Sequence, residues 1–184
     1  MSGTGPLAVL VGPPGAGKST VGRMLAGRLG TTLRDTDRDV ERVAGKTVAE
    51  VFYDDGEDAF RALERAAVAA ALREHDGLLA LGGGAVLDAG TRELLRRSGS
   101  PVVLLEVGLS DAAKRVGFAR DRPVLALNPR ATLRELMAAR APLYDEVATV
   151  RIPTGGVSPS QVVGAVVAAL RDLPGAAAAE EAGG

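Results

Sequence analysis

Residues 12–19, which read GPPGAGKS, are the segment whose residue types and spacing point most directly to a chemical role. They satisfy the pattern G-x-x-x-x-G-K-[ST] at every required position. Glycines let backbone N–H groups face phosphate oxygens, and a helix beginning near Lys18 points its positive dipole end at them. Lys18 is expected to reach the β and γ phosphates, and the Ser19 hydroxyl is expected to bind Mg²⁺. The segment predicts binding of a nucleoside triphosphate and leaves the reaction open.

Asp35 and Asp37 are the candidate carboxylates for that reaction. Many phosphate-loop enzymes end a later strand in an aspartate that orients magnesium. The run at 79–84, LALGGG, has no carboxylate, and we interpret Glu106 as lying inside its apolar run rather than at its end. The two aspartates can face different ways, one toward magnesium through water and one toward the acceptor; an ordinary helix cap is the alternative. The sequence has no N-K-x-D stretch for guanine recognition, which argues against a GTPase.

Three arginines are candidates for binding anions, although a solvated surface role is the default for any one of them. Arg61 begins a long helical pattern, Arg122 lies in the aperiodic segment 117–130, and Arg140 stands shortly before a proline. Paired arginines hold a carboxylate, and a mobile arginine neutralises a phosphoryl group during transfer. We therefore expect a small acidic acceptor and a mobile lid at 117–130 that excludes water. His75, the only histidine, is expected at a helix end without a catalytic role.

Strands and helices alternate along the chain, which predicts an α/β fold with a parallel sheet covered on both faces. The expected strands are 7–11, 33–35, 78–81, 101–106 and 148–152. The expected helices are 19–29, 36–43, 48–55, 57–75, 88–97, 110–116, 132–140 and 158–170, with capping boxes at Thr47 and Thr132. We expect one kinase-type domain over 1–173 and a frayed tail over 174–184.

The bulk composition limits the partners. The 184 residues carry a formal net charge of −1, so the chain has no general basic field for nucleic acid. It has no cysteine, which is typical of a cytoplasmic protein. The apolar run near the N-terminus is too short for a signal peptide or a membrane span. We expect a cytoplasmic monomer without nucleic-acid or membrane partners.

Six blocks together resemble one family, shikimate kinase. They are GPPGAGKST (12–20), DTD (35–37), DGEDAFR (55–61), GGGAV (82–86), RDRPVL (120–125) and ARAPLY (139–144). The likeness runs from about residue 7 to 151 in the family's order and spacing. It implies ATP-dependent phosphorylation of the 3-hydroxyl of shikimate, on the route to chorismate and the aromatic amino acids. It also implies a three-layer α/β/α sandwich of the nucleoside-monophosphate-kinase type, with a five-stranded parallel sheet and a mobile lid.

The resemblance also implies roles for individual residues on the nucleotide side. Arg115 would flank the adenine, and Arg122 would reach the transferring phosphate from the lid. Ser19 would bind Mg²⁺, with Asp35 holding the ion through water. The residues implied to bind ATP are Gly15, Ala16, Gly17, Lys18, Ser19, Thr20, Arg115 and Arg122.

For the acceptor, the resemblance implies that Asp37 binds the hydroxyls and accepts a proton. Arg61 and Arg140 would clamp the carboxylate, and the glycines Gly82, Gly83 and Gly84 would line the same pocket. The catalytic set is then Asp37, Lys18 and Arg122.

One segment departs from the family pattern. Residues 151–159, RIPTGGVSP, keep Pro159 but have Pro153 and Val157 where the family carries polar residues that contact adenine. The adenine contacts there are expected to be mostly backbone and apolar.

Two other interpretations fit the phosphate loop. A sibling kinase, such as a gluconate kinase or a nucleoside monophosphate kinase, shares the loop and lid but needs different acceptor contacts. A non-catalytic ATP-binding module should have lost Asp37, Lys18 or Arg122, and all three are present.

Overall fold

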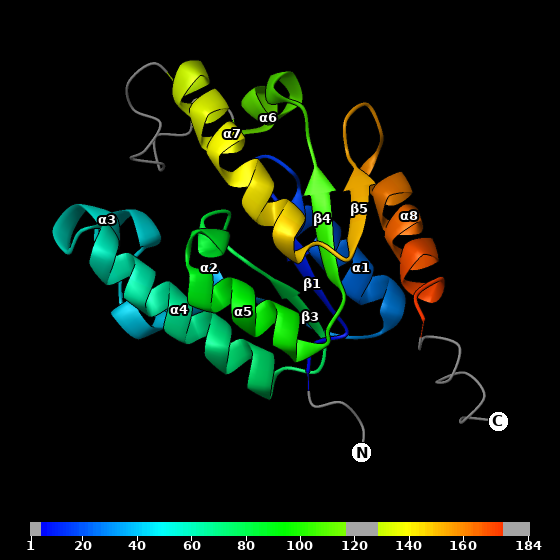
Figure 1. The fold of residues 1–184 in the computed structure, drawn as a ribbon, viewed down its shortest axis with the longest axis horizontal. Helices are drawn as coiled ribbons and strands as arrows, with labels where there is room; N and C mark the ends of the chain where they lie inside the picture. The colour runs from blue at the N-terminus through cyan, green and yellow to red at the C-terminus, as the bar shows by residue number, and fades with distance from the viewer. Residues whose placement is uncertain (1–4, 117–128, 175–184) are drawn as a thin grey trace.

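The computed structural model describes residues 5–116 and 129–174. Within them, five parallel strands form one sheet in the order β2-β3-β1-β4-β5. The strands are β1 (Ala8–Val11), β2 (Leu33–Asp35), β3 (Leu78–Ala80), β4 (Val102–Glu106) and β5 (Val150–Pro153). Figure 1 labels β1, β3, β4 and β5. The predicted five-stranded parallel sheet is confirmed, with bounds shifted by one or two residues.

Helices cover both faces of the sheet (Figure 1). On one face, α1 (Lys18–Leu29) and α8 (Pro159–Arg171) pack on Ala8 and Leu10; on the other, α4 (Glu57–Glu74), α5 (Ala89–Ser98) and α7 (Pro129–Val147) pack on Val9 and Val11. The β1 side chains alternate because successive residues of a strand point to opposite faces. Both faces are therefore apolar, and the predicted three-layer α/β/α sandwich is confirmed.

Shorter helices lie at the two sides of the sheet. At the β2 edge, α2 (Thr36–Ala44) and α3 (Val48–Asp54) bury Val40 and Val51 against Phe60 of α4. At the other side, α6 (Leu109–Val116) buries Ala112 against Leu133 of α7. A 3₁₀ turn, η1 (Ala85–Leu87), which the sequence patterns did not predict, follows the three glycines.

Local capping chemistry begins several of these helices. Thr47 opens α3 with a capping box to Glu50, as predicted, and Asp35 caps α2 by accepting the Asp37 N–H at 3.0 Å. His75 is the C-terminal cap residue of α4, which confirms its expected place at a helix end. The capping box predicted at Thr132 is wrong, because α7 begins three residues earlier, at Pro129.

The sequence predicts a helix to about Arg140 or beyond, and α7 runs through Pro142 to Val147. A proline inside a helix removes one backbone hydrogen bond. Tyr144 and Val147, after the proline, are both buried against the sheet. Burial of these side chains stabilises the continued helix and offsets the lost bond.

Part of the predicted lid and tail lies outside the described residues. Residues 117–128, which include Arg122, and residues 175–184 are the parts of the lid and tail outside the described ranges. Pro129 and Arg130, predicted as the end of the lid, belong to α7 instead. Within residues 5–116 and 129–174, no helix has the length and apolar character needed to cross a lipid bilayer.

Candidate active site

A cleft of about 710 Å³ opens at the carboxyl ends of the strands. In parallel sheets this edge is the usual place for ligands. The predicted site residues that the structure describes all line it: Gly15, Ala16, Gly17, Lys18, Ser19, Thr20, Asp35, Asp37, Arg61, Gly82, Gly83, Gly84, Arg115 and Arg140. Arg122 lies outside the described residues. The fold therefore brings together residues from six separate parts of the sequence, while their individual roles stay predictions.

The phosphate loop joins β1 to α1 and needs glycine for its shape. Gly15 and Gly17 have φ values of 80° and 93°, a left-handed region that other residues rarely adopt. A methyl group on Gly15 would also lie 2.8 Å from the Ala112 carbonyl oxygen. Lys18 donates from Nζ to the carbonyl oxygens of Gly12 at 2.6 Å and Pro13 at 3.1 Å. Its charge therefore lies beside the loop, at the amino end of α1.

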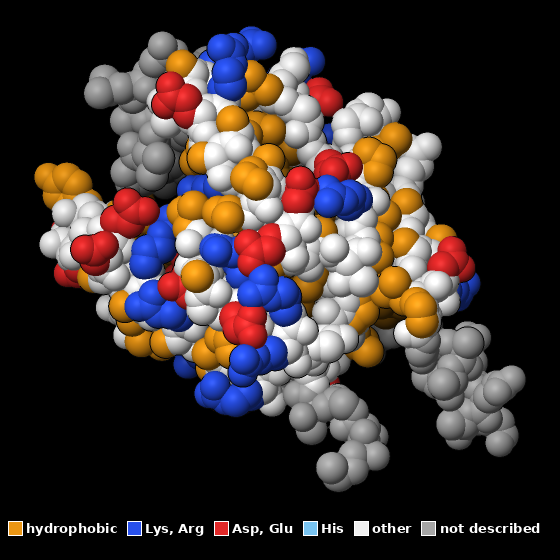
Figure 2. Space-filling view, viewed as in Figure 1, with side chains coloured by type: hydrophobic (Ala, Val, Ile, Leu, Met, Phe, Trp, Pro, Cys, Tyr) orange, Lys and Arg blue, Asp and Glu red, His pale blue; other side chains and the backbone are white. Residues whose placement is uncertain are grey.

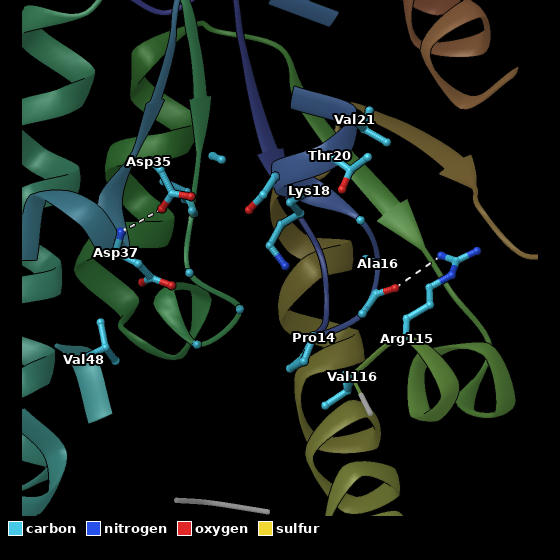
Figure 3. A pocket seen from close by; sticks show the side chains of 18 of the residues that line it. Pro14, Ala16, Lys18, Thr20, Val21, Asp35, Asp37, Val48, Arg115 and Val116 are labelled. Carbon is cyan, nitrogen blue, oxygen red and sulfur yellow. Dashed lines mark hydrogen bonds between the residues drawn. The ribbon is translucent and has the colours of Figure 1, made fainter. Parts of the chain in front are cut away.

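Asp35 and Asp37 lie together across the cleft from this loop. Asp35 ends β2 and Asp37 stands in the first turn of α2, and Figure 3 shows both on one side of Lys18. Thr36 between them is fully buried; its Oγ1 donates to the Ala80 carbonyl at 3.4 Å and accepts the Gly82 N–H at 3.3 Å. This bond pair fixes the two aspartates beside the glycine turn. Asp35 is thus a helix cap and a cleft residue at once.

The oxygens of Ser19 and Asp35 suit a magnesium ion. Mg²⁺ takes few protein ligands and completes its octahedron with water and phosphate oxygens. A carboxylate has several lone pairs, so Asp35 can accept the Asp37 N–H and still serve a cation or its water. Within the described ranges no group of three or more His, Cys, Asp or Glu side chains gathers as a metal cage. The pair therefore fits an ion that arrives with its nucleotide.

Glu106 is the last residue of β4, which is where the predicted strand 101–106 ends, although the apolar run continues past it with Val107. Its side chain is exposed and lies 3.7 Å from the Arg151 guanidinium. It does not line the cleft. The end of β4 accordingly supplies no carboxylate to the site.

The glycine turn at 82–84 is required by its neighbours rather than by an unusual backbone. None of its three residues has a left-handed φ, and Gly84 has a φ of −96°. A methyl group on Gly82 would lie 2.5 Å from Oδ1 of Asp37, and one on Gly84 would lie 2.6 Å from Nη2 of Arg61. On Gly83 it would lie 3.4 Å from the Gly12 carbonyl oxygen and 3.5 Å from Nη1 of Arg140. At Gly82 and Gly84 the missing side chains leave the space that Asp37 and Arg61 occupy, whereas the distances at Gly83 are ordinary contacts.

Arg61 and Arg140 approach the glycine turn from α4 and α7. Arg61 donates from Nη1 to Glu64 at 2.7 Å, and its guanidinium lies 5.2 Å from the ring centre of Phe60. Burial lowers the pKa of Arg140, the positive charge of Arg61 lowers it further, and Tyr144 and Glu64 oppose the shift. Arg61 and Arg140 both line the cleft, and two cations at one site favour an anionic ligand between them.

Glu64 and Tyr144 are site residues that the sequence reasoning missed. Glu64 is 3% exposed, and burial raises the pKa of its carboxyl group while Arg61 opposes that rise. Burial likewise raises the pKa of Tyr144 to about 12. Their spacing was the available signal, because Glu64 follows Arg61 by three residues and Tyr144 follows Arg140 by four, so each pair shares a helix face.

Arg115 forms the other wall of the cleft, opposite Asp35 and Asp37 (Figure 3). It donates from Nη1 to the Gly15 carbonyl at 3.2 Å and from Nη2 to the Thr154 carbonyl at 2.6 Å. Thr154, which the sequence reasoning also missed, accepts a further Arg115 bond at 3.0 Å and donates to the Glu106 carbonyl at 2.8 Å. Val157 and Pro159 line the same wall. Segment 151–159, which departs from the family pattern, therefore supplies apolar surface beside the buried hydroxyl of Thr154.

Comparison with known proteins agrees with this geometry. The family model described as shikimate kinase matches residues 14–171. The chain belongs to the shikimate kinase family. A shikimate kinase of Saccharopolyspora erythraea is 60% identical over 163 residues, which cover 88% of this chain and 92% of that one.

Solved structures support the shikimate kinase fold. A shikimate kinase from Acinetobacter baumannii in complex with shikimate superposes with a TM-score of 0.87 at 35% identity, covering 92% of this chain and 96% of that chain. A gluconokinase from Sinorhizobium meliloti 1021 matches with a TM-score of 0.55 at 20% identity, covering 92% and 93%, and so shares the fold alone. The resemblance and the fold class predicted from the sequence are confirmed.

Proposed function

We propose that the chain transfers the γ-phosphoryl group of ATP to the 3-hydroxyl of shikimate, within the biosynthesis of chorismate and the aromatic amino acids. The observation that carries the proposal is the place of Gly83, between the phosphate loop and Arg140. An acceptor on the glycine turn would touch a carboxylate-binding arginine on one side and the donor phosphates on the other. We call Asp37, Arg61, residues 82–84 and Arg140 the acceptor side of the cleft.

The charges of the acceptor side suit a polyol that carries a carboxylate. Arg61 and Arg140 would bind the carboxylate, since planar guanidinium groups match its geometry in two parallel hydrogen bonds. The turn at 82–84 would approach the ring closely, because it carries no side chains. Asp37, beside Gly82, would accept hydrogen bonds from the acceptor hydroxyls.

The nucleotide side of the cleft, which consists of residues 12–20, Arg115 and Thr154, would hold ATP. Backbone N–H groups of the loop and the amino end of α1 would bind the phosphates, with Lys18 on the β and γ groups. Arg115 would lie against the adenine. Ser19 and, through water, Asp35 are the residues that would hold Mg²⁺, which when bound supplies charge neutralisation at the phosphate oxygens.

In the transfer step the acceptor hydroxyl oxygen attacks the γ-phosphorus. The new O–P bond forms while the bond from the γ-phosphorus to the β–γ bridging oxygen breaks, and ADP leaves with that electron pair. Asp37 accepts the hydroxyl proton, and Arg122 is proposed to neutralise the moving phosphoryl group. The monomeric state and the cytoplasmic location both stay predictions.

The test is an ADP-release assay with Mg·ATP across shikimate, quinate, gluconate and nucleoside monophosphates. Turnover on shikimate well above the others is expected. Turnover on gluconate or a nucleotide without turnover on shikimate would identify a sibling kinase. ATP binding without turnover on any acceptor would identify a binding module.

A further inference from the structure

Tyr144 makes a buried hydrogen bond at the acceptor side that no predicted role uses. Its hydroxyl donates to the Gly83 carbonyl oxygen at 2.6 Å, and the residue is 3% exposed. The bond joins α7 to the middle of the glycine turn, 61 residues earlier in the chain. A phenol has one hydrogen, so its oxygen keeps lone pairs for a second partner.

Arg140 is the candidate second partner. It precedes Tyr144 by one helical turn, so both side chains leave the same face of α7. Tyr144 also opposes the lowering of the Arg140 pKa by burial, so the two groups interact. Nη1 of Arg140 would also be 3.5 Å from a methyl group on Gly83. The Tyr144 oxygen therefore connects a turn carbonyl to a guanidinium that faces the acceptor.

The helix itself is anchored by a separate set of contacts. Arg92 of α5 donates from Nε to Glu146 of α7 at 2.8 Å and from Nη1 to the Val86 carbonyl of η1 at 2.8 Å. Figure 2 shows basic and acidic side chains intermingled on the face that α4, α5 and α7 present. The apolar ring of Tyr144 packs with Val147 in the sheet cluster. The hydroxyl is thus dispensable for holding α7 in place.

We propose that Tyr144 is a positioning residue that sets the Arg140 guanidinium against the glycine turn and so tunes affinity for the acceptor carboxylate. The proposal rests on the proposed function, because it assigns Arg140 to the acceptor. Phenylalanine at 144 would keep the ring packing and remove the hydroxyl, with its bond to the Gly83 carbonyl and its interaction with Arg140. Arg140 would then be held less tightly where it meets the carboxylate.

The experiment compares Tyr144→Phe with Tyr53→Phe, a matched control because Tyr53 is 88% exposed. Isothermal titration with shikimate and with MgADP, and steady-state kinetics, give affinity for each side of the cleft. For Tyr144→Phe we expect the Kd and KM for shikimate to rise about tenfold, the effect of losing a hydrogen bond to a charged group. The MgADP Kd and the kcat should stay near wild type, as should all values for Tyr53→Phe, while the thermal midpoint of Tyr144→Phe falls because the Gly83 carbonyl loses its donor.

A double-mutant cycle with Arg140→Ala identifies the route of the effect. If Tyr144 acts through Arg140, adding Tyr144→Phe to Arg140→Ala changes the shikimate Kd by less than about twofold. Additive losses, an unchanged shikimate Kd, or equal losses of shikimate and MgADP affinity would each overturn the inference. If the wild-type enzyme neither binds shikimate nor turns it over, the proposed function is overturned, and this inference with it.

Discussion

The Arg61 guanidinium and the Glu64 carboxylate lie 2.7 Å apart, and the Glu64 side chain is only 4% exposed. Glu57 also contacts Arg61, at 3.2 Å, but its side chain is 62% exposed. A buried partner holds a guanidinium far more firmly than an exposed one, because water does not screen the contact. Arg61 therefore has its orientation fixed from inside the protein before any acceptor arrives.

Glu64→Gln should weaken binding of the acceptor. The amide keeps the size of the side chain but loses its charge, so Arg61 is held less tightly; we expect the KM for shikimate to rise about tenfold. Glu57→Gln is the control and should change this KM by less than about twofold. Equal effects of the two substitutions, measured by steady-state kinetics, would contradict a special role for the buried carboxylate.

The burial of Glu64 also predicts a pH dependence of stability. Because its pKa is raised above the ordinary 4.5, the folded protein binds this proton more tightly than the unfolded chain does. The stabilisation is complete below pH 4.5 and is lost as pH rises through the folded-state pKa. Urea denaturation of wild type and Glu64→Gln over pH 4.5–8 should show wild type losing stability relative to the variant. Parallel pH curves for the two proteins would rule this out.

Gly84→Ala should displace Arg61 while the fold survives. The added methyl group would meet the far end of a flexible side chain, 2.6 Å from Nη2, so Arg61 moves and the backbone does not. We expect a rise in the shikimate KM of about tenfold or more, from loss of a charged hydrogen bond. Gly27→Ala in α1 meets nothing within 4 Å and should instead stabilise the protein by about 0.5–1 kcal/mol. A normal shikimate KM in Gly84→Ala would show that Arg61 has room to spare.

Thr154→Val should affect the nucleotide side alone. The change removes the hydroxyl that accepts from Arg115 and donates to Glu106, so Arg115 loses one of its bonds to the β5 end. We expect the MgADP Kd to rise about threefold to tenfold, with the shikimate Kd unchanged. Thr149→Val is the control, because it loses a bond to the Val102 N–H away from the cleft. A loss of shikimate affinity in Thr154→Val would mean that the two sides are coupled.

Asp37→Asn should separate binding from chemistry. The substitution keeps the shape beside Gly82 but removes the proton acceptor, so kcat should fall by about 10²-fold or more while MgADP binding persists. Asp58→Asn, on the exposed start of α4, serves as the control. Stopped assays that find wild-type turnover in Asp37→Asn would remove Asp37 as the base.

Features that depend on a few adjacent residues were predictable from the sequence. The phosphate loop, the cap at Asp35 and the capping box at Thr47 each arise from contacts within about one helical turn, so their patterns are complete in the sequence. The five-stranded parallel sheet followed from alternation and from the family resemblance. At Thr132 the same local pattern was present but misleading, because α7 was already under way.

Features that depend on distant partners were not predictable in this way. Thr154 and Tyr144 gain their importance from Arg115 and from Gly83, which lie far away in the sequence. The spacing of Arg61 and Glu64 indicates a shared helix face, but it does not show that α4 buries this carboxylate. The continuation of α7 through Pro142 likewise depends on the sheet that Tyr144 and Val147 cover.

The strand order has a consequence for how such enzymes change. The central strand β1 carries the phosphate loop; β2 and β3 lead to Asp37 and residues 82–84 on one flank, and β4 and β5 lead to Arg115 and Thr154 on the other, while Arg61 and Arg140 enter the cleft from α4 and α7. The edge of the sheet is therefore laid out in the order of the reactants, with strands about 4.8 Å apart. If the proposed roles hold, substitutions at Asp37 and residues 82–84 alter contacts with the acceptor at one end of the cleft, while Arg115 and Thr154 stand at the other end.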